Sequence, residues 1–170
     1  MKQLNITLST DSISKAIKEL KAYKAEINKK SELLVQTLTD LGVNIARAKV
    51  LEMNINDTGN LMSTIGGYYS PNLNAGFVTV SCEYAIFIEF GTGIVGKQNP
   101  YPGDAMAKTG YKYGGGSHYV VTKDGRIGWF YPADDGTWRF TEGLPSRPFM
   151  YETALELENK FSNIVRSVFK

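Results

Sequence analysis

Apolar residues recur at helical spacing over the first third of the chain. One series places an isoleucine or leucine every seven residues, at Ile13, Leu20, Ile27, Leu34 and Leu41. A second row follows members of the first by four residues, at Ile17, Leu38 and Ile45. This pattern predicts an amphipathic helix from about residue 12 to residue 53, roughly 60 Å long at ~1.5 Å per residue. Ser9, Thr10, Asp11 and Ser12 offer side-chain oxygens that cap its start.

Two polar residues, Lys24 and Ser31, interrupt the second row of this stripe. The segment 28–31 is therefore a candidate kink, or a break into two helices. Two interpretations of the stripe stay open. The whole helix packs on a sheet of its own domain, or one end projects beyond the domain and packs on a neighbouring subunit. An apolar stripe that its own domain does not cover implies a partner.

Strand patterns precede and follow this helix. Residues 3–8 alternate apolar and polar side chains, as a half-buried strand does. Residues 56–60 form a turn, and residues 61–69 and 76–82 are predicted strands. Only residues 70–75 separate these two strands, which are therefore expected to form an antiparallel pair.

The middle of the chain is rich in aromatic residues and glycine. Residues 84–90 fit either a short helix or a strand, and we favour a short helix that ends at Gly91. Most of the glycines lie between Gly91 and Gly143. We expect a flexible loop at about residues 92–117 and a β-hairpin at about 118–131, where residues 123–126 form the turn.

A second amphipathic helix closes the sequence. Ser146 is the candidate cap, and Pro148 falls in the first turn, where its missing N–H costs little. The buried stripe is predicted to comprise Met150, Ala154, Leu157, Phe161, Ile164 and Val168. The fold class is therefore α+β: a small antiparallel sheet packed by the long N-terminal helix and the C-terminal helix, with a flexible loop and a β-hairpin insertion, as one domain over residues 1–170.

The sequence shows no pattern typical of catalysis or metal binding. His118 is the only histidine and Cys82 the only cysteine, too few for the usual four ligands of a zinc site. A nucleophilic arrangement of Ser117, His118 and Asp124 is the alternative, but these residues lie too close in sequence to align readily. Cys82 ends an apolar strand and is expected to be a small buried residue. We therefore expect no enzyme, no metal and no cofactor.

Glu89 stands out because it is a charge inside an aromatic cluster. A buried carboxylate needs a partner, and Arg147 is the candidate. Such an ion pair would tie the short helix at 84–90 to the start of the C-terminal helix. The alternative is that Glu89 faces solvent.

Charge and composition limit the classes of partner that are expected. The formal net charge of +2 is modest for a dedicated nucleic-acid-binding domain. The first residues do not read as a secretory signal, and no segment approaches the roughly 20 apolar residues of a membrane span. A single cysteine fits a reducing compartment. The basic half of the long helix, with Lys15, Lys18, Lys21, Lys24, Lys29 and Lys30, keeps open a sequence-independent contact with DNA phosphates.

The ordered motifs resemble a known family. They are the N-terminal strand and long helix, Thr58 to Leu61, Tyr84 to Thr92, the aromatic and glycine pattern from Trp129 to Gly143, and the run Arg147 to Met150 before the last helix. Together these are similar to the tail-component proteins of long-tailed DNA phages, the HK-ninety-seven gene-product-ten-like family. Nothing is carried over for the variable stretch between Gly93 and Tyr119.

The resemblance implies a structural virion protein of a phage or prophage. It would act at the head–tail joint (the neck) or in tail completion, through assembly into a ring and without catalysis. Its partners would be further copies of itself and other neck or tail proteins, with non-specific passage of DNA, and with no membrane and no small-molecule substrate. Assembly would take place in the bacterial host cytoplasm and the protein would reside in the virion. The alternatives are a tail terminator or minor tail protein and, in another class, a non-specific DNA-binding module.

The candidate assembly residues come from the two aromatic segments. They are Tyr84, Phe87, Glu89, Phe90, Gly91, Trp129, Tyr131, Trp138, Arg147, Pro148, Phe149 and Met150.

Overall fold

The long N-terminal helix is continuous. The computed structural model describes residues 7–55, 59–114, 119–133 and 135–170, and helix α1 spans Thr10–Glu52 without interruption. Ser9, one of the four candidate caps, is the N-cap, and its hydroxyl accepts a hydrogen bond from the backbone N–H of Ser12. The expected kink or break at residues 28–31 does not occur. That segment holds no proline or glycine, and a Glu26–Lys30 ion pair spans one turn of helix there.

The predicted antiparallel pair is confirmed. Strand β1 (Ile65–Ser70) pairs with β2 (Ala75–Val80), with Ile65 opposite Val80 and Ser70 opposite Ala75. The first residues of the predicted first strand instead form a short helix, α2 (Asn60–Ser63). The hydroxyls of Ser63 and Thr64 donate to nearby backbone carbonyls, which stabilises the helical turn over an extended chain.

Two expectations fall partly or wholly outside the described residues. Of the predicted strand at 3–8, only Thr7 and Leu8 are described, and neither is in a strand. Of the predicted turn at 56–60, residues 56–58 are not described.

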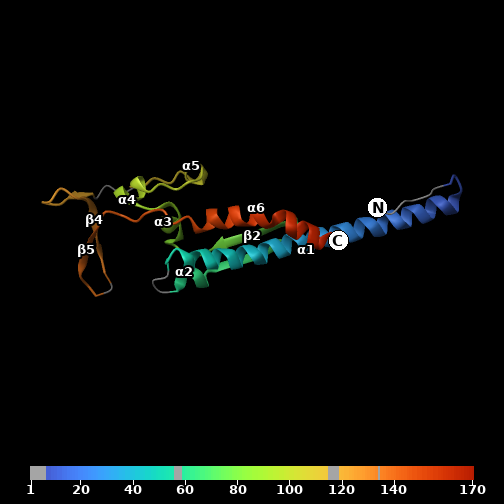
Figure 1. Cartoon of the computed structure of the whole chain (residues 1–170), viewed down its shortest axis with the longest axis horizontal. Helices are drawn as coiled ribbons and strands as arrows, with labels where there is room; N and C mark the ends of the chain where they lie inside the picture. The colour runs from blue at the N-terminus through green and yellow to red at the C-terminus, as the bar shows by residue number, and fades with distance from the viewer. Residues whose placement is uncertain (1–6, 56–58, 115–118, 134) are drawn as a thin grey trace.

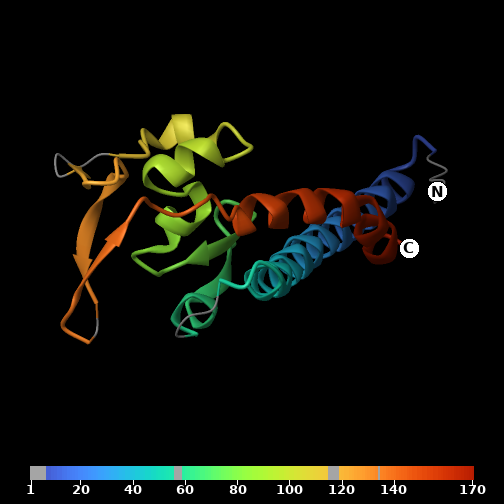
Figure 2. The same ribbon diagram turned by 60° about the vertical axis from the view of Figure 1, so that its left-hand side comes forward.

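The body of the molecule consists of three packed elements: the C-terminal half of α1, the β1–β2 sheet and helix α6 (Phe149–Val168) (Figures 1 and 2). Gly42 of α1 permits the close approach, because a Cβ at this position would meet the side chains of Val78 and Leu157. At its far end α6 reaches Lys30, whose ammonium donates to the backbone carbonyl of Lys170 at 3.3 Å.

The hydrophobic core sits at one end of this body. Its buried residues come from α1, α2, β1, the start of α6 and the connections that follow α1 and β2, and they are Ala46, Val50, Ile55, Leu61, Ile65, Cys82 and Phe149. Cys82 is buried, as expected for a small core residue. The core is therefore built where the aromatic middle of the chain joins the two long helices.

The buried face of α6 differs from the predicted stripe. Phe149 and Thr153 are its buried residues, whereas Ala154 and Phe161 of the predicted stripe are exposed. The helix packs against α1, and its two buried residues, Phe149 and Thr153, each lie one residue before Met150 and Ala154 of the predicted stripe. Ser146 does not cap the helix: the N-cap position is Pro148, and the Ser146 hydroxyl donates elsewhere.

The middle of the chain forms an insertion with its own secondary structure. The short helix predicted at 84–90 is present as α3 (Ala85–Phe90) and ends at Gly91, as expected. The stretch expected to be a flexible loop contains two short helices, α4 (Gly93–Gln98) and α5 (Ala105–Thr109). The tyrosines of that stretch supply the packing that holds them.

The predicted hairpin is confirmed and gains a third strand. Strand β3 (Val120–Val121) pairs antiparallel with β4 (Ile127–Pro132), and β4 also pairs antiparallel with β5 (Trp138–Thr141). The α+β class is thus confirmed, with a two-stranded and a three-stranded sheet.

The molecule is extended. Figure 1 places the β3–β4–β5 sheet at one end and the N-terminal half of α1 at the other, beyond the end of α6. The accessible surface is 11998 Å² for 18.8 kDa, against about 8,300 Å² expected of a compact monomer of that mass. No helix among the described residues is long and apolar enough to cross a membrane.

Candidate functional site

The insertion leaves the body and returns to it at one junction. Thr92 donates its backbone N–H to Leu144 at 2.8 Å, and Ile94 donates to Glu142 at 2.9 Å. Gly143 has a φ of +110°, and a Cβ there would collide with the carbonyl of Thr92. The two crossing segments therefore touch backbone to backbone, and glycine is required where they meet.

Tyrosine side chains fasten α4 and α5 over α3. The Tyr111 hydroxyl donates to the carbonyl of Gly91 at 2.6 Å, and the Tyr113 hydroxyl accepts from the backbone N–H of Tyr101 at 2.9 Å. The ring of Phe90 meets Tyr101 edge-on, with centroids 4.8 Å apart. Burial raises the pKa of Tyr111. These tyrosines are structural anchors of the insertion, which explains why residues 92–114 are ordered despite their glycines.

Glu89 joins α3 to the start of α6. Its side chain is buried, with the residue 8% exposed, and the carboxylate accepts from the backbone N–H groups of Met150 at 2.9 Å and Tyr151 at 3.0 Å. The expected connection between the two helices is present, but the predicted partner Arg147 is wrong. The orphan N–H groups of the first turn of α6 take the place of the guanidinium.

The environment of Glu89 also sets its ionisation. Burial raises the pKa of its carboxyl above the ordinary value of 4.5, while the hydrogen bonds from Met150 and Tyr151 act in the opposite direction. The nearby carboxylate of Glu152 adds to the increase. The hydroxyl of Ser146 donates to the Glu89 backbone carbonyl at 2.6 Å and completes this connection.

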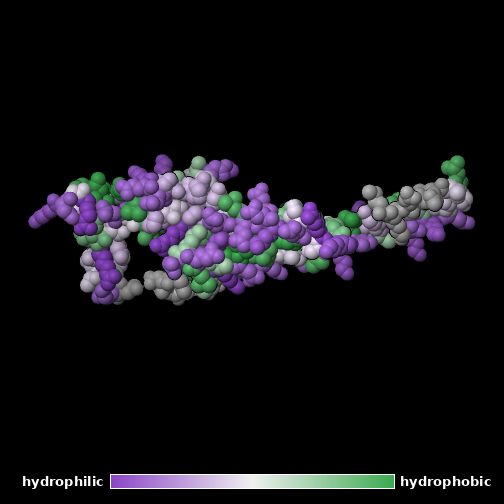
Figure 3. Space-filling view, viewed as in Figure 1, coloured by the Kyte–Doolittle hydropathy of each residue, from purple (hydrophilic) through white to green (hydrophobic). Residues whose placement is uncertain are grey.

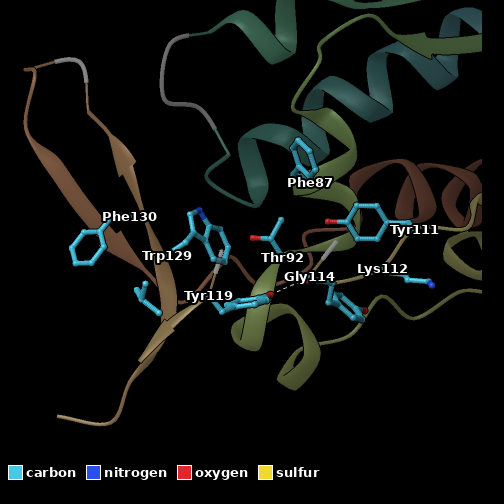
Figure 4. A pocket seen from close by; sticks show the side chains of 10 residues that line it. Phe87, Thr92, Tyr111, Lys112, Gly114, Tyr119, Trp129 and Phe130 are labelled. Atoms are coloured by element: carbon cyan, nitrogen blue, oxygen red, sulfur yellow. Dashed lines mark hydrogen bonds between the residues drawn. The ribbon is translucent and has the colours of Figure 1, made fainter. Parts of the chain in front are cut away.

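A groove opens between α3 and the three-stranded sheet, and we call it the aromatic groove. Its volume is about 850 Å³, and its walls are Asn54, Ile55, Tyr84, Phe87, Ile88, Thr92, Trp129, Tyr131, Thr141, Leu144 and Arg147. An adjoining cavity of about 520 Å³ shares Phe87, Thr92 and Trp129 with it and continues among the tyrosines of the insertion. Figure 4 shows Trp129 directed toward Thr92 in this cavity, with Phe130 on the other side of β4.

The predicted assembly residues separate into three groups. Tyr84, Phe87, Trp129, Tyr131 and Arg147 line the aromatic groove. A second group lies beneath or beside it in the folded core and junction: Glu89, Phe90, Gly91, Pro148, Phe149 and Met150. Trp138 lies apart from the groove-lining residues on β5 and is 68% exposed. Leu144 also lines the groove, although the sequence analysis did not name it. Its position directly after Gly143 was the one signal that could have pointed to it.

The second exposed apolar surface is on the part of α1 that extends past α6. We call Ile13, Ile17 and Leu20 the projecting stripe; they are 42%, 48% and 50% exposed. On the same helical face within the body, Ile45 is only 5% exposed. In the view of Figure 3, hydrophobic side chains reach the surface along the body and at the tip of the projecting end.

Charged residues accompany the projecting stripe. Six lysines and three acidic residues lie between Thr10 and Lys30. At 3.6 residues per turn, Lys15, Lys18 and Lys29 fall on the face opposite the stripe. Lys24 stands in the stripe itself, one turn beyond Leu20. The projecting end is thus apolar on one side and basic on the other.

The alternative nucleophilic arrangement of Ser117, His118 and Asp124 is only partly described. Ser117 and His118 lie outside the described residues, and Asp124 pairs with Arg126 at 2.8 Å on an exposed turn. Among the described residues no group of three or more His, Cys, Asp or Glu gathers in one place. Comparisons with protein-family models, with curated proteins and with solved structures found no match to this chain.

Proposed function

We propose that this chain is an assembly protein of a long-tailed phage or prophage that acts in the neck or in tail completion by forming a ring. The observation that carries the proposal is the projecting stripe. Three large apolar side chains stand on a helix that runs past the end of its own body, and the described residues of the chain leave them about half exposed. Half-exposed apolar side chains gathered on one helical face are typical of a protein–protein contact.

The excess surface supports the same function. A chain that exposes 11998 Å² gains stability when part of that area is covered by other subunits. The resemblance of the ordered motifs to phage tail-component proteins supports the proposed setting, a virion neck or tail that is built in the bacterial cytoplasm. A tail terminator or minor tail protein is the alternative within this class.

The proposed mechanism is binding without catalysis. The groove and the stripe offer aromatic and aliphatic contact area, which is the usual source of binding energy at interfaces. The modest net charge of +2 suits a ring through which DNA passes without being held.

The test is the mass of the purified full chain in solution as a function of concentration, followed by imaging of any rings. Ring assembly predicts that the mass rises to a fixed multiple of the monomer. A chain that stays monomeric from micromolar to millimolar concentration contradicts the proposal. In a phage that carries this gene, deletion is expected to abolish infectious particles.

A second function, non-specific DNA binding, is favoured by the basic face of the projecting end. It predicts a DNA affinity that falls steeply with salt, in proportion to the number of phosphates contacted. Replacing Lys15, Lys18 and Lys29 together by glutamine would abolish such binding and leave ring assembly intact.

A further inference from the structure

We propose that the projecting stripe of one copy docks in the aromatic groove of the next copy, so that neighbouring subunits are joined head to tail. This inference rests on the proposed assembly function and names the two surfaces that perform it. The occupant of the groove is a second copy of this chain, presented as a helix with apolar residues one turn apart.

The two surfaces lie at opposite ends of the molecule. Figures 1 and 2 show the projecting end of α1 and the three-stranded sheet beside the groove at opposite ends of the molecule. Each copy therefore keeps its groove free while its own helix is engaged. A contact between two different surfaces of the same chain is heterologous, and it closes into a ring when the rotation between subunits allows.

The groove matches the stripe in volume and in the chemistry of its lining. The groove holds about 850 Å³ and is lined largely by apolar and aromatic side chains. Clefts of roughly 300–1,000 Å³ bury small-molecule ligands, so the groove has room for apolar side chains of the stripe. Ile13, Ile17 and Leu20 follow the spacing by which an amphipathic helix places anchors in a groove.

Charged side chains flank both surfaces. Arg147 lines the groove, and among the described residues its guanidinium makes no ion pair. Glu83, exposed and adjacent to the groove residue Tyr84, likewise has no ion-pair partner there. The projecting helix carries a matching charge for Glu83, because Lys24 stands within the row of the stripe, whereas Glu19 follows Lys15 by one turn on the other side of the helix. A helix laid along the groove with Lys24 beside the carboxylate of Glu83 pairs these two opposite charges.

Lys24 also disfavours the main competing occupant. If two projecting helices paired in parallel along this stripe, Lys24 would face Lys24 of the second copy across an apolar seam. Like charges at a core position destabilise such a pair. Lys24 is therefore better accommodated beside a carboxylate than beside itself.

The experiment is a mixing test with two variants of the full chain. Ile17→Glu disables the stripe and leaves the groove, while Leu144→Asp disables the groove and leaves the stripe. Each variant alone is expected to self-associate at least ~10-fold more weakly than wild type. Mixed in equal amounts, the two are expected to form a one-to-one dimer, because one intact stripe meets one intact groove.

The control is Leu33→Glu, which changes an exposed leucine on α1 that lies outside the stripe. It is expected to assemble as wild type does. Unchanged circular dichroism and unfolding midpoints show that the variants are folded. Arg147→Glu serves as a second groove variant if Leu144→Asp does not fold.

The outcomes separate this inference from the proposed function. If wild type assembles and both variants also assemble, the contact uses other surfaces, and only the inference is overturned. If the groove variant assembles alone and mixing rescues nothing, pairing between stripes is the answer and the inference is again wrong. If wild type itself never associates, both the inference and the assembly function fail.

Discussion

The carboxylate of Glu89 lies 2.9 Å from the backbone nitrogen of Met150 and accepts its hydrogen bond at the start of α6. A residue of α3 thereby caps a helix that begins 60 residues later in the chain. The same carboxylate accepts from Tyr151 at 3.0 Å. The short helix that forms one wall of the aromatic groove is thus held to the body by an acid at a helix N-terminus.

Removing this cap is expected to destabilise the fold. Glu89→Ala leaves the N–H groups of Met150 and Tyr151 without their acceptor in a mostly buried place, which costs about 1–3 kcal/mol. Urea unfolding of the two proteins measures the difference. Glu83→Ala is the matched control: this exposed carboxylate lies six residues earlier, and its loss should change stability by less than about 0.5 kcal/mol. Equal effects at the two positions would show that the cap has no energetic role.

The same residue predicts a pH dependence. The pKa of Glu89 is raised in the folded state by burial, so its contribution to stability is fully present below the ordinary value of 4.5 and is lost as pH rises through the raised pKa. The stability of wild type relative to Glu89→Gln should therefore fall as pH rises above 4.5. Denaturant titrations between pH 4 and pH 8 give this difference. A difference that grows with pH would mean that the helix N-terminus outweighs burial.

The junction of the insertion should not tolerate a side chain at Gly143. Gly143→Ala forces a residue with φ of +110° to carry a Cβ against the Thr92 carbonyl, and the combined strain and overlap should cost about 2–5 kcal/mol. Gly125→Ala is the control, because its φ is +82° but the space around it is open; about 1 kcal/mol is expected there. Thermal or urea unfolding compares the two. A smaller loss at Gly143 than at Gly125 would refute the close contact.

The tyrosine anchors predict a local effect. Tyr111→Phe removes the hydrogen bond to the Gly91 carbonyl and should cost about 0.5–1.5 kcal/mol. Hydrogen exchange is the measurement, and amides of α4 are expected to exchange faster than in wild type. In the control Tyr68→Phe the tyrosine is 54% exposed and its hydroxyl has no partner among the described residues, so exchange should not change.

One helical face should show two different responses. Ile45 and Ile17 lie on the same stripe of α1, but Ile45 is 5% and Ile17 is 48% exposed. Ile45→Ala should cost about 2–5 kcal/mol of stability because it empties a packed site. Ile17→Ala should cost well under 1 kcal/mol and instead weaken self-association. Parallel measurements of unfolding and of sedimentation separate the two effects; a large loss of stability at Ile17 would mean that the stripe is covered within the chain.

Much of the local structure was encoded in short-range patterns. The period of the apolar residues, with the cap candidates at residues 9–12, predicted α1 nearly to its ends, and Gly91 marked the end of α3. The turn residues 70–75 and 123–126 predicted the β1–β2 and β3–β4 pairs, but not the pairing of β4 with β5. These signals are local, because a helix or a hairpin is specified by residues close to one another in the chain.

The tertiary structure decided which parts of the chain these elements contact. Arg147 was the natural sequence-level partner for Glu89, yet the carboxylate turns to the backbone of α6. Every helix start has unpaired N–H groups, but the sequence does not show which distant side chain will accept from them. The order of residues 92–114 was equally hidden, since it depends on the hydroxyls of Tyr111 and Tyr113 reaching the backbone of Gly91 and Tyr101. The uncovered stretch of α1 likewise follows from where α6 ends against Lys30. Burial is a property of packed neighbours, so the same apolar stripe becomes core at Ile45 and a free surface at Ile17.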